Sequence, residues 1–224
     1  MPAWSYSSIK TYDQCPKKYY HLKVAKDVKD EGGEAADYGS AVHEAAEFFV
    51  KDGTPIPDKF AYMRPVVERL AALPGDKHAE LKLGLKFDAD GVAAPCDFFD
   101  PDVWYRGIVD LLIVNGTKAH MVDYKTGKNA RYADVKQLDL MAAAIFTHFP
   151  EVLQIKSALL FVVAGTLVPK THIFTDRHTY MNVFSTQLAQ LEHSMDSGVW
   201  NAKSSGLCGW CPVTTCMHWR PKRK

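Results

Sequence analysis

The sequence lacks the features that would place the chain in a membrane or carry it out of the cell. It contains no uninterrupted apolar segment that approaches the roughly 20 residues of a membrane-spanning helix. Its first residues, MPAWSYSSIK, show no basic region followed by an apolar run, so no secretory signal peptide is predicted. We therefore expect a cytoplasmic protein, in the host cytoplasm if a phage encodes it.

An excess of charge is also missing. The 27 basic and 26 acidic residues leave a formal net charge of +1, which neither indicates nor excludes a nucleic-acid partner. The motif G-x-x-x-x-G-K-[ST] does not occur, which excludes an ATP-driven motor of that type. With 47% hydrophobic residues in a chain of 224, a core can form without disulfide bonds.

Cysteine is scarce and unevenly placed. The chain has five cysteines, an odd number, and Cys208, Cys211 and Cys216 lie together near the C-terminus. In a reducing compartment such clustering is more typical of metal or cluster ligands than of disulfides. A tetrahedral thiolate site needs four ligands, and the candidates for the fourth are Cys15, in QCPKKYY, and Cys96. Cys96 has no ligand-like neighbour, which favours a small buried side chain there.

The periodicity of the hydrophobic residues predicts an α/β domain. Helices are expected at 39–51, 58–73, 132–148 and 178–196, and strands at 79–87, in two runs within 103–126, at 157–165 and at 168–176. Helices and strands in this order imply a mixed central sheet that is flanked by helices.

The dipeptide Asn115-Gly116 separates two β-rich runs and is the strongest short signal for a hairpin. If these two residues form the turn, Asp110 faces Met121, and Asp123 lies two residues further along its strand. Directly opposed and diagonal neighbours lie within about 5–8 Å of each other. Both carboxylates can therefore reach one small site.

Lys125 joins this pair because it lies two residues beyond Asp123, on the same face of the strand. An isolated D-x-K is usually part of a solvated sheet face, but the apolar residues around Asp110 and Asp123 indicate a buried strand pair. Buried charges are paired or bind metal, and Mg²⁺ or Mn²⁺ prefers carboxylate oxygens. A lysine beside such a site can position or deprotonate an attacking water, or offset phosphate charge.

The segments GIVD and VDYKTGK resemble motifs II and III of the PD-(D/E)XK nucleases, in particular the RecB branch. The resemblance implies three catalytic residues, Asp110, Asp123 and Lys125, of which the two aspartates bind metal. It also implies a metal contact from the backbone carbonyl of Tyr124. GSAVHEAAE is similar to the upstream motif G-x-x-x-H-x-x-x-E of the branch, which implies that His43 is a further metal ligand.

Two more segments extend the resemblance over most of the chain. KQLDLMAAA places Gln137 at the glutamine of the family's trailing helix, which implies a DNA contact, although Met141 stands where the family often has tyrosine. SYSSIKTYDQCPKKYY is similar to the N-terminal segment of the branch. The implied fold is a restriction-endonuclease-like core, at about 39–200, within a single nuclease domain that spans residues 1–224.

The resemblance also bears on the cysteines. Iron–sulfur members of the branch, such as the AddB nuclease domain and the small CRISPR-associated adaptation exonuclease, have one N-terminal cysteine and three near the C-terminus. The matching residues are Cys15, Cys208, Cys211 and Cys216, which implies a [4Fe–4S] cluster held by segments 1–30 and 201–224. Zinc is the alternative, since spacing alone does not separate the two, and His218 is a substitute ligand. Such a link closes nearly the whole chain, so we expect a structural staple.

Basic and aromatic residues flank these cysteines at both ends of the chain. Basic grooves with aromatic platforms suit single-stranded DNA, and a solvated basic face is the alternative. The candidates of this kind are Lys17, Lys18, Tyr19, Tyr20, His21, Lys23, Lys26, Trp210, Trp219, Arg220, Lys222, Arg223 and Lys224. Among them, Lys17, Lys18 and Tyr20 are the predicted DNA contacts.

The sequence leaves the roles of two glutamates open. Glu47 lies one helical turn after His43, where it can orient the histidine, approach the metal or simply be solvated. Glu80 lies on the polar face of its predicted strand, where a surface carboxylate is favoured over a ligand that acts through water.

These features together predict a metal-dependent DNA exonuclease with a structural [4Fe–4S] cluster and a Mg²⁺ or Mn²⁺ site. The expected substrate is single-stranded DNA or DNA ends. The protein would act alone or with a helicase, recombination or CRISPR partner. The alternatives are a nucleic-acid-binding module without turnover and a zinc-stapled partner protein of the nuclease fold.

Overall fold

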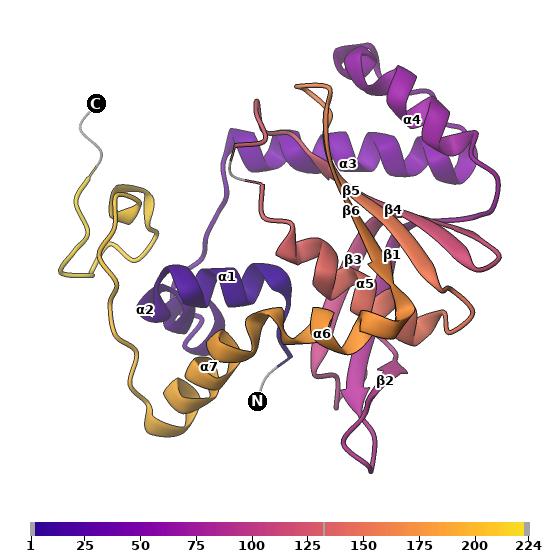
Figure 1. Ribbon diagram of the computed structural model, residues 1–224. Helices are drawn as coiled ribbons and strands as arrows, with labels where there is room; N and C mark the ends of the chain where they lie inside the picture. The colour runs from indigo at the N-terminus through magenta and orange to yellow at the C-terminus, as the bar shows by residue number, and fades with distance from the viewer. Residues whose placement is uncertain (1–2, 132, 222–224) are drawn as a thin grey trace. The chain divides into compact units, whose positions relative to one another are not determined.

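The computed structural model describes residues 3–131 and 133–221 (Figure 1). The chain divides into two compact units. One is the segment Gly33–Val183, and the other combines the N-terminal segment up to Gly32 with the C-terminal segment from Phe184 onward. The larger unit therefore ends before the last helix that the sequence assigned to the core, and the single-domain organisation stays a prediction.

The larger unit is built on a six-stranded sheet with the order β2-β1-β3-β4-β5-β6. Its strands are β1 (Asp76–Phe87), β2 (Ala93–Cys96), β3 (Tyr105–Asn115), β4 (Lys118–Lys125), β5 (Gln154–Phe161) and β6 (Thr166–Ile173). Only β4 and β5 run parallel. That pair needs a crossover, which α5 (Lys136–His148) supplies. The predicted mixed α/β architecture is confirmed.

Helices cover both faces of this sheet, with α3 (Glu34–Asp52) behind it and α5 in front of it in Figure 1. The core behind the sheet joins α3 to β3 and β4 through Val42, Ala46, Leu111, Ile113 and Val122, which are all buried. The short 3₁₀ helix η2 (Asp58–Met63) and α4 (Arg64–Ala71) close this core. Helix α3 is thereby fixed against the strands that carry Asp110 and Asp123.

The predicted helices at 58–73 and 178–196 are each interrupted. Pro65 lies in the first turn of α4, where its missing N–H leaves no donor unsatisfied, and the segment before it is 3₁₀. The second region contains α6 (Arg177–Met181), a 3₁₀ turn η4 (Asn182–Phe184) and α7 (Ser185–Ser197). Another 3₁₀ turn, η3 (Phe174–Asp176), precedes α6.

Helix α5 is buried from residue 137 to residue 146, so the predicted apolar stripe is only part of its contact surface. A buried polar network fastens α5 to β5 and β6. The carboxylate of Asp139 accepts from His172 Nε2 at 2.9 Å and pairs with Lys170 Nζ at 2.6 Å. Ser157 Oγ lies 3.2 Å from His172 Nδ1. The network holds the start of α5, and therefore Gln137, close to the sheet.

The hairpin between β3 and β4 has a different turn from the predicted one. Asn115 pairs with Lys118 and Val114 pairs with Ala119, so the two turn residues are Gly116 and Thr117. Gly116 has φ 58°, and glycine at the first central position is typical of a type II′ turn. The prediction that Asp110 faces Met121 is therefore wrong, since Met121 pairs with Leu112.

The terminal unit packs α1 (Tyr6–Gln14), α2 (Pro16–Tyr19) and a π-helical turn η1 (Tyr20–Val24) with α7 and the C-terminal segment. Tyr12 Oη lies 2.8 Å from Ser194 Oγ, and Tyr19 stacks on Trp200. Cys15 has an extended backbone between α1 and α2, because Pro16 cannot continue the helical hydrogen bonding. None of the helices in the described residues has the length and apolar character needed to cross a membrane.

Candidate metal centre

Asp110 and Asp123 lie where β3 and β4 separate. The observed pairing of these strands ends at Leu111 and Val122, and one further step along the same register brings Asp110 opposite Asp123. Instead of a backbone pair, the Tyr124 backbone N–H donates to Asp110 Oδ2 at 2.6 Å. Asp110 is 8% exposed and Asp123 is 2% exposed. The strand pair thus carries two buried carboxylates on neighbouring strands, directly beyond the end of the observed pairing.

His43 reaches this point from α3. Its Nδ1 lies 3.3 Å from Asp110 Oδ2, and its ring stands edge-on to the ring of Tyr124. Burial lowers the pKa of His43, but the hydrogen bond to Asp110 and the charges of Asp110, Asp123 and Glu80 raise it, and the net shift of the pKa is upward. The imidazole therefore lies in a strongly anionic environment.

Glu80 also faces this group, which the sequence did not predict. It sits on β1 between the paired residues Ala79 and Leu81, so that it stands across from Asp110. Its Oε1 lies 4.0 Å from His43 Nδ1, and its side chain is 28% exposed. Glu80 has φ 51°, which is rare for a residue with a side chain and redirects it out of the normal strand alternation. The expected surface carboxylate is therefore a half-buried member of the centre.

Lys125 and Gln137 surround Asp123 on its other side. Lys125 Nζ lies 2.6 Å from Asp123 Oδ2 and donates to Gln137 Oε1 at 2.9 Å. Gln137 Nε2 in turn donates to Asp123 Oδ1 at 2.5 Å. The amide of Gln137 thus holds both the carboxylate and the ammonium group. The implied DNA contact of Gln137 stays a prediction, and its observed partners are these two residues.

The ionised form of Asp123 is disfavoured. Burial and, after it, the charge of Asp110 raise the pKa of Asp123, Lys125 only partly opposes this, and the net result is a pKa raised to about 6. The pKa of Glu80 is also raised, first by burial and then by the charge of Asp110. Carboxylates that repel one another in a buried site need a cation to be stable together.

The ligand atoms of His43, Glu80 and Asp110 all lie within 4.8 Å of one another. Within residues 3–131 and 133–221, no other three histidine, cysteine or acidic side chains are so close. Imidazole nitrogen and carboxylate oxygens suit a divalent cation such as Mn²⁺ or Mg²⁺. Asp123 stands outside this tight group, held by Gln137 and Lys125. An open hollow of about 770 Å³, lined by α3 and Glu80, gives solvent access to the centre.

Replacing Glu80 by glutamine is expected to weaken Mn²⁺ binding about tenfold, because one of the two carboxylates grouped with His43 would be lost. The matched control is Glu47→Gln. Glu47 lines the same hollow, but its carboxylate is paired with Lys51. Calorimetric titration with Mn²⁺ checks both variants. Equal affinities for Glu80→Gln and the wild type would contradict a role of Glu80 in the centre.

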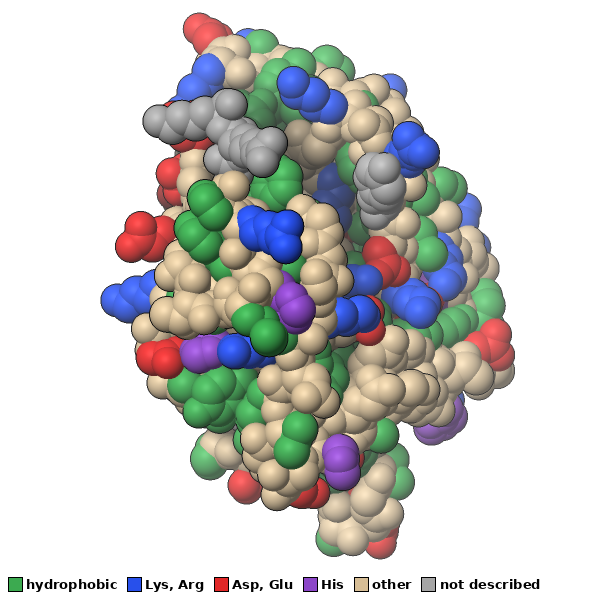
Figure 2. Space-filling model, turned by 90° about the vertical axis from the view of Figure 1, so that its left-hand side faces the viewer, with side chains coloured by type: hydrophobic (Ala, Val, Ile, Leu, Met, Phe, Trp, Pro, Cys, Tyr) green, Lys and Arg blue, Asp and Glu red, His purple; other side chains and the backbone are tan. Residues whose placement is uncertain are grey.

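The predicted DNA contacts Lys17, Lys18 and Tyr20 lie in the terminal unit. Lys18 Nζ donates to Gln14 Oε1 and lies 3.8 Å from an Asp30 carboxylate oxygen. Tyr20 packs against Trp200. On the face shown in Figure 2, basic side chains are interspersed with acidic and hydrophobic ones. These contacts stay predictions, and Lys222, Arg223 and Lys224 lie outside the described residues.

The four cysteines singled out in the sequence line one cavity of the terminal unit. The cavity has a volume of about 220 Å³ and is lined by Cys15, Cys208, Cys211 and Cys216, together with His218 and others. The 3₁₀ turn η5 (Cys208–Trp210) carries the first of the three C-terminal thiols. Cys96 lies on β2, in the other unit. The fold therefore brings Cys15 to the C-terminal cysteines and leaves Cys96 apart.

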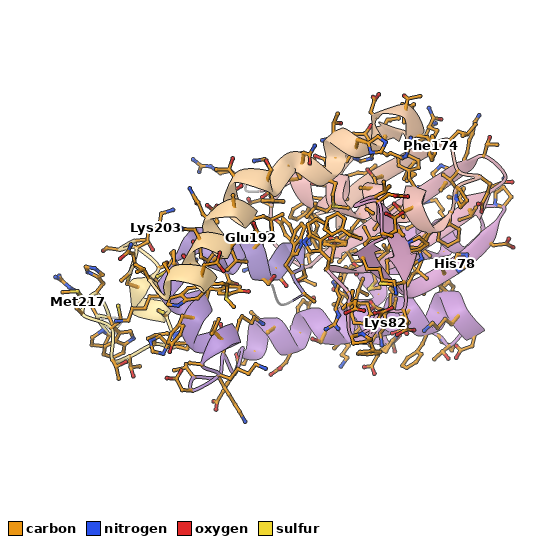
Figure 3. All side chains as sticks on the ribbon, turned by 90° about the horizontal axis from the view of Figure 1, so that it is seen from below. His78, Lys82, Phe174, Glu192, Lys203 and Met217 are labelled. Carbon is orange, nitrogen blue, oxygen red and sulfur yellow. The ribbon has the colours of Figure 1, made fainter. Side chains whose placement is uncertain are left out.

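Backbone N–H groups point at two of these sulfurs. The N–H of Lys203 lies 3.4 Å from Cys15 Sγ, and the N–H of Ser205 lies 3.3 Å from Cys208 Sγ. Lys203 is labelled in Figure 3. Its ammonium group also donates to the backbone carbonyl oxygen of Asp13. Hydrogen bonds of this kind stabilise the thiolate form that a metal ion or a cluster requires of its cysteine ligands.

The spacing of the thiols is wide for zinc. Zn–S bonds of about 2.3 Å in a tetrahedron hold sulfurs about 3.8 Å apart. In the described part of the chain, no three cysteine sulfurs lie within 4.8 Å of one another. Four thiols that line one cavity are the donor set of either a zinc ion or a cluster, and both stay predictions.

Comparisons with known proteins bear on the family and the fold of the chain. No curated protein sequence matches the chain. A crystal structure from Eubacterium rectale, described provisionally as an exonuclease, is similar with a TM-score of 0.50 and 13% identity over 99% of this chain and 90% of that one. A crystal structure named SSO0001 has a TM-score of 0.49 and 11% identity over 97% of this chain and 87% of that one. The profile of the PD-(D/E)XK nuclease superfamily matches residues 3–216. The mixed sheet with its helices is thus the restriction-endonuclease-like fold, and the chain belongs to the PD-(D/E)XK nuclease superfamily.

Proposed function

We propose that this protein is a metal-dependent DNA exonuclease with a structural [4Fe–4S] cluster. The observation that carries the proposal is the meeting of His43, Glu80 and Asp110 within 4.8 Å beside the Asp123–Lys125 pair. Members of the superfamily hydrolyse phosphodiester bonds with divalent metal ions. The exonuclease activity is proposed from the likeness of the motifs to the RecB branch and from the description of the Eubacterium rectale protein.

Each side chain of the centre has a distinct proposed role. His43, Asp110, Asp123 and the carbonyl of Tyr124 are the proposed ligands of Mg²⁺ or Mn²⁺. When bound, such a cation polarises the scissile phosphate and offsets its developing charge. Lys125 offers its ammonium group to the attacking water or to a phosphate oxygen, and Gln137 holds Lys125 in place from Oε1.

The four-cysteine cavity supports the cluster half of the proposal. Its thiols come from both ends of the chain, and two of them accept backbone hydrogen bonds. A bound cluster supplies a covalent link between residue 15 and residues 208–216. The proposed consequence is stability of the terminal unit, which also carries the candidate DNA contacts Lys17, Lys18 and Tyr20. The nuclease would act alone or serve a helicase, recombination or CRISPR partner in the cytoplasm.

The proposal is tested by cleavage of end-labelled DNA with Mn²⁺ under anaerobic conditions. Linear single-stranded DNA should be shortened from an end, while circular single-stranded DNA of the same sequence should persist. Lys125→Ala should lower the rate about 10³-fold, because the group beside the attacking water is lost. Lys128→Ala, which removes an exposed lysine three residues away, should keep the wild-type rate.

Two results would contradict this assignment. Equal rates for Lys125→Ala and the wild type would leave the chain as a nucleic-acid-binding module without turnover. Cleavage of circular DNA as fast as linear DNA would make it an endonuclease. Separately, anaerobically purified protein that contains zinc and no iron would identify the cysteine site as a zinc staple.

A further inference from the structure

A patch of aromatic and basic side chains continues the sheet surface beyond the metal centre. We call it the aromatic–basic patch, and it consists of Lys82, Phe98, Phe99 and Arg106. Lys82 Nζ lies 5.9 Å from the ring centroid of Phe98 and 5.6 Å from that of Phe99. Arg106 Cζ lies 5.5 Å from the ring centroid of Phe98. The two rings meet edge to face, with centroids 5.1 Å apart.

The patch lies on the same face of the sheet as the metal centre. Lys82 is two residues beyond Glu80 on β1 and pairs with Ile108, which is two residues before Asp110 on β3. Because Glu80 departs from the normal strand alternation, the face of Lys82 follows from its position relative to α3 and not from its spacing from Glu80. Figure 3 shows Lys82 on the side of the sheet that α3 covers, and α3 carries His43. At about 3.3 Å per residue, Lys82 and Arg106 lie roughly 7 and 13 Å along the strands from the centre.

Phe99 is exposed without an evident structural reason. Its side chain is 69% exposed, which leaves most of the ring without the burial that stabilises a phenylalanine in a core. The loop beneath it is nevertheless well organised. Asp97 Oδ1 accepts from the Phe99 backbone N–H at 2.7 Å, and Asp100 accepts from the Asp102 N–H at 2.8 Å. These hydrogen bonds hold the backbone of the loop from which the ring of Phe99 projects.

Charges of both signs surround the rings, because Asp97, Asp100 and Asp102 belong to the loop that carries them. Asp100 is paired with Lys86 at 2.7 Å, so this carboxylate is neutralised within the protein. In the described part of the chain, neither Lys82 nor Arg106 forms an ion pair, and the Nε of Arg106 has no hydrogen-bond acceptor. Two cations therefore remain beside the rings for an anionic ligand.

We propose that the aromatic–basic patch is a subsite for single-stranded DNA, in which a base stacks on Phe99 and the adjacent phosphates lie against Lys82 and Arg106. Base-on-ring stacking with nearby cations is the usual way in which single strands are bound without sequence preference. At about 3.4 Å per stacked nucleotide, the distance from the centre corresponds to roughly two to four nucleotides. In a duplex the base faces are covered by their neighbours, so the patch selects unpaired DNA. This deepens the proposed nuclease function and depends on it.

The test measures binding of the protein to a fluorescent oligothymidine and to a blunt duplex. Ca²⁺ takes the place of Mn²⁺ so that the DNA stays intact, and the length of the DNA is checked after the measurement. Phe99→Ala should weaken binding of the single strand about tenfold and leave duplex binding unchanged. Leu167→Ala is the matched control, because Leu167 is 53% exposed on β6, at the opposite edge of the sheet. Lys82→Gln should weaken single-strand binding more than Lys156→Gln, which removes an exposed lysine from β5.

A second substrate separates stacking from general attraction. A series of oligothymidines carries one abasic site each, placed one nucleotide further from the end in each oligomer. One of these oligomers, with the abasic site within the first few nucleotides, should bind the wild type about tenfold more weakly than the intact oligomer does. Phe99→Ala should bind that abasic oligomer as well as it binds the intact one. Independent, additive losses from the abasic site and from Phe99→Ala would overturn the subsite, as would unchanged single-strand affinity of Phe99→Ala.

If the wild type cleaves DNA while Phe99→Ala binds normally, the subsite fails and the nuclease function stands. If the wild type neither binds nor cleaves DNA, the proposed function itself fails.

Discussion

Asp123→Asn is expected to abolish DNA cleavage and, at the same time, to stabilise the protein in the absence of divalent cations. Asp123 is 2% exposed, and burial and the charge of Asp110 raise its pKa to about 6 from 3.8. The folded protein therefore binds this proton more tightly than the unfolded chain does. The contribution of Asp123 to stability is largest below about pH 4 and is lost as the pH rises through about 6. Asparagine resembles the protonated carboxyl, so it avoids that loss.

The gain from Asp123→Asn should be absent near pH 4 and should approach about 3 kcal/mol in the free energy of unfolding above pH 7, since about 2 pKa units are involved. Urea unfolding at pH 4.5 and pH 8, without added divalent cations, measures it. Added Mn²⁺ should stabilise the wild type and have little effect on the variant. Metal affinity of the wild type should also fall below about pH 6, because the cation competes with the proton on Asp123.

Asp139→Asn is the matched control. Asp139 is 4% exposed, but hydrogen bonds from His172 and Lys170 outweigh its burial and lower its pKa. Its contribution to stability is therefore present above its unfolded pKa and is lost on acidification, so Asp139→Asn should destabilise the protein at pH 8. If Asp123→Asn also destabilised the metal-free protein at pH 8, the carboxylates of the centre would not be mutually repulsive.

Cys15→Ser is expected to prevent binding of the proposed cluster and to destabilise the terminal unit. The proposed link from residue 15 to residues 208–216 would close a loop of nearly the whole chain. A crosslink of that span lowers the entropy of the unfolded state by an amount worth roughly 5 kcal/mol. The helices α1, α2 and α7 also pack through contacts such as Tyr12–Ser194 and Tyr19–Trp200, so urea unfolding measures how much of the stability of the terminal unit depends on Cys15.

Iron and sulfide content of anaerobically purified protein, together with urea unfolding, checks this expectation. Cys96→Ser is the control, since Cys96 lies on β2 and does not line the cavity. It should retain iron and stability. Loss of iron from Cys96→Ser, or full iron content in Cys15→Ser, would show that the four ligands are assigned wrongly.

The local features of the hairpin could be predicted because their causes are local. Apolar runs around Asp110 and Asp123 require a buried strand pair, and alternation then fixes the faces of both carboxylates. The turn lies one residue later than predicted, so that Val114 pairs with Ala119 in place of Thr117. The pairing of the two strands is thereby shifted by two residues, which preserves the face of every side chain, whereas a shift of one residue would reverse it. Asp110 and Asp123 therefore remain on one face of the strand pair although the predicted turn is wrong.

Glu80 could not be predicted in the same way. Strand alternation placed it among exposed lysines, and only its left-handed backbone, with φ 51°, turns the carboxylate toward His43. Nothing in the neighbouring residues signals that conformation, because it is imposed by the pairing of β1 with β3 and by the packing of α3. Gln137 is a similar case, since its contacts with Lys125 and Asp123 depend on where α5 docks.

The sequence by itself determined the alternating helices and strands, the strand positions of Asp110, Asp123 and Lys125, and the grouping of three C-terminal cysteines. These depend on spacing along the chain, which periodicity and turn chemistry govern. Only the tertiary structure decided that Glu80 joins the metal centre, that Cys15 lines the cavity with the other three cysteines while Cys96 does not, and that Phe99 stands exposed along the sheet from the metal centre. Each of these depends on contacts between segments that are distant in the chain, and such contacts are set by the packing of whole elements.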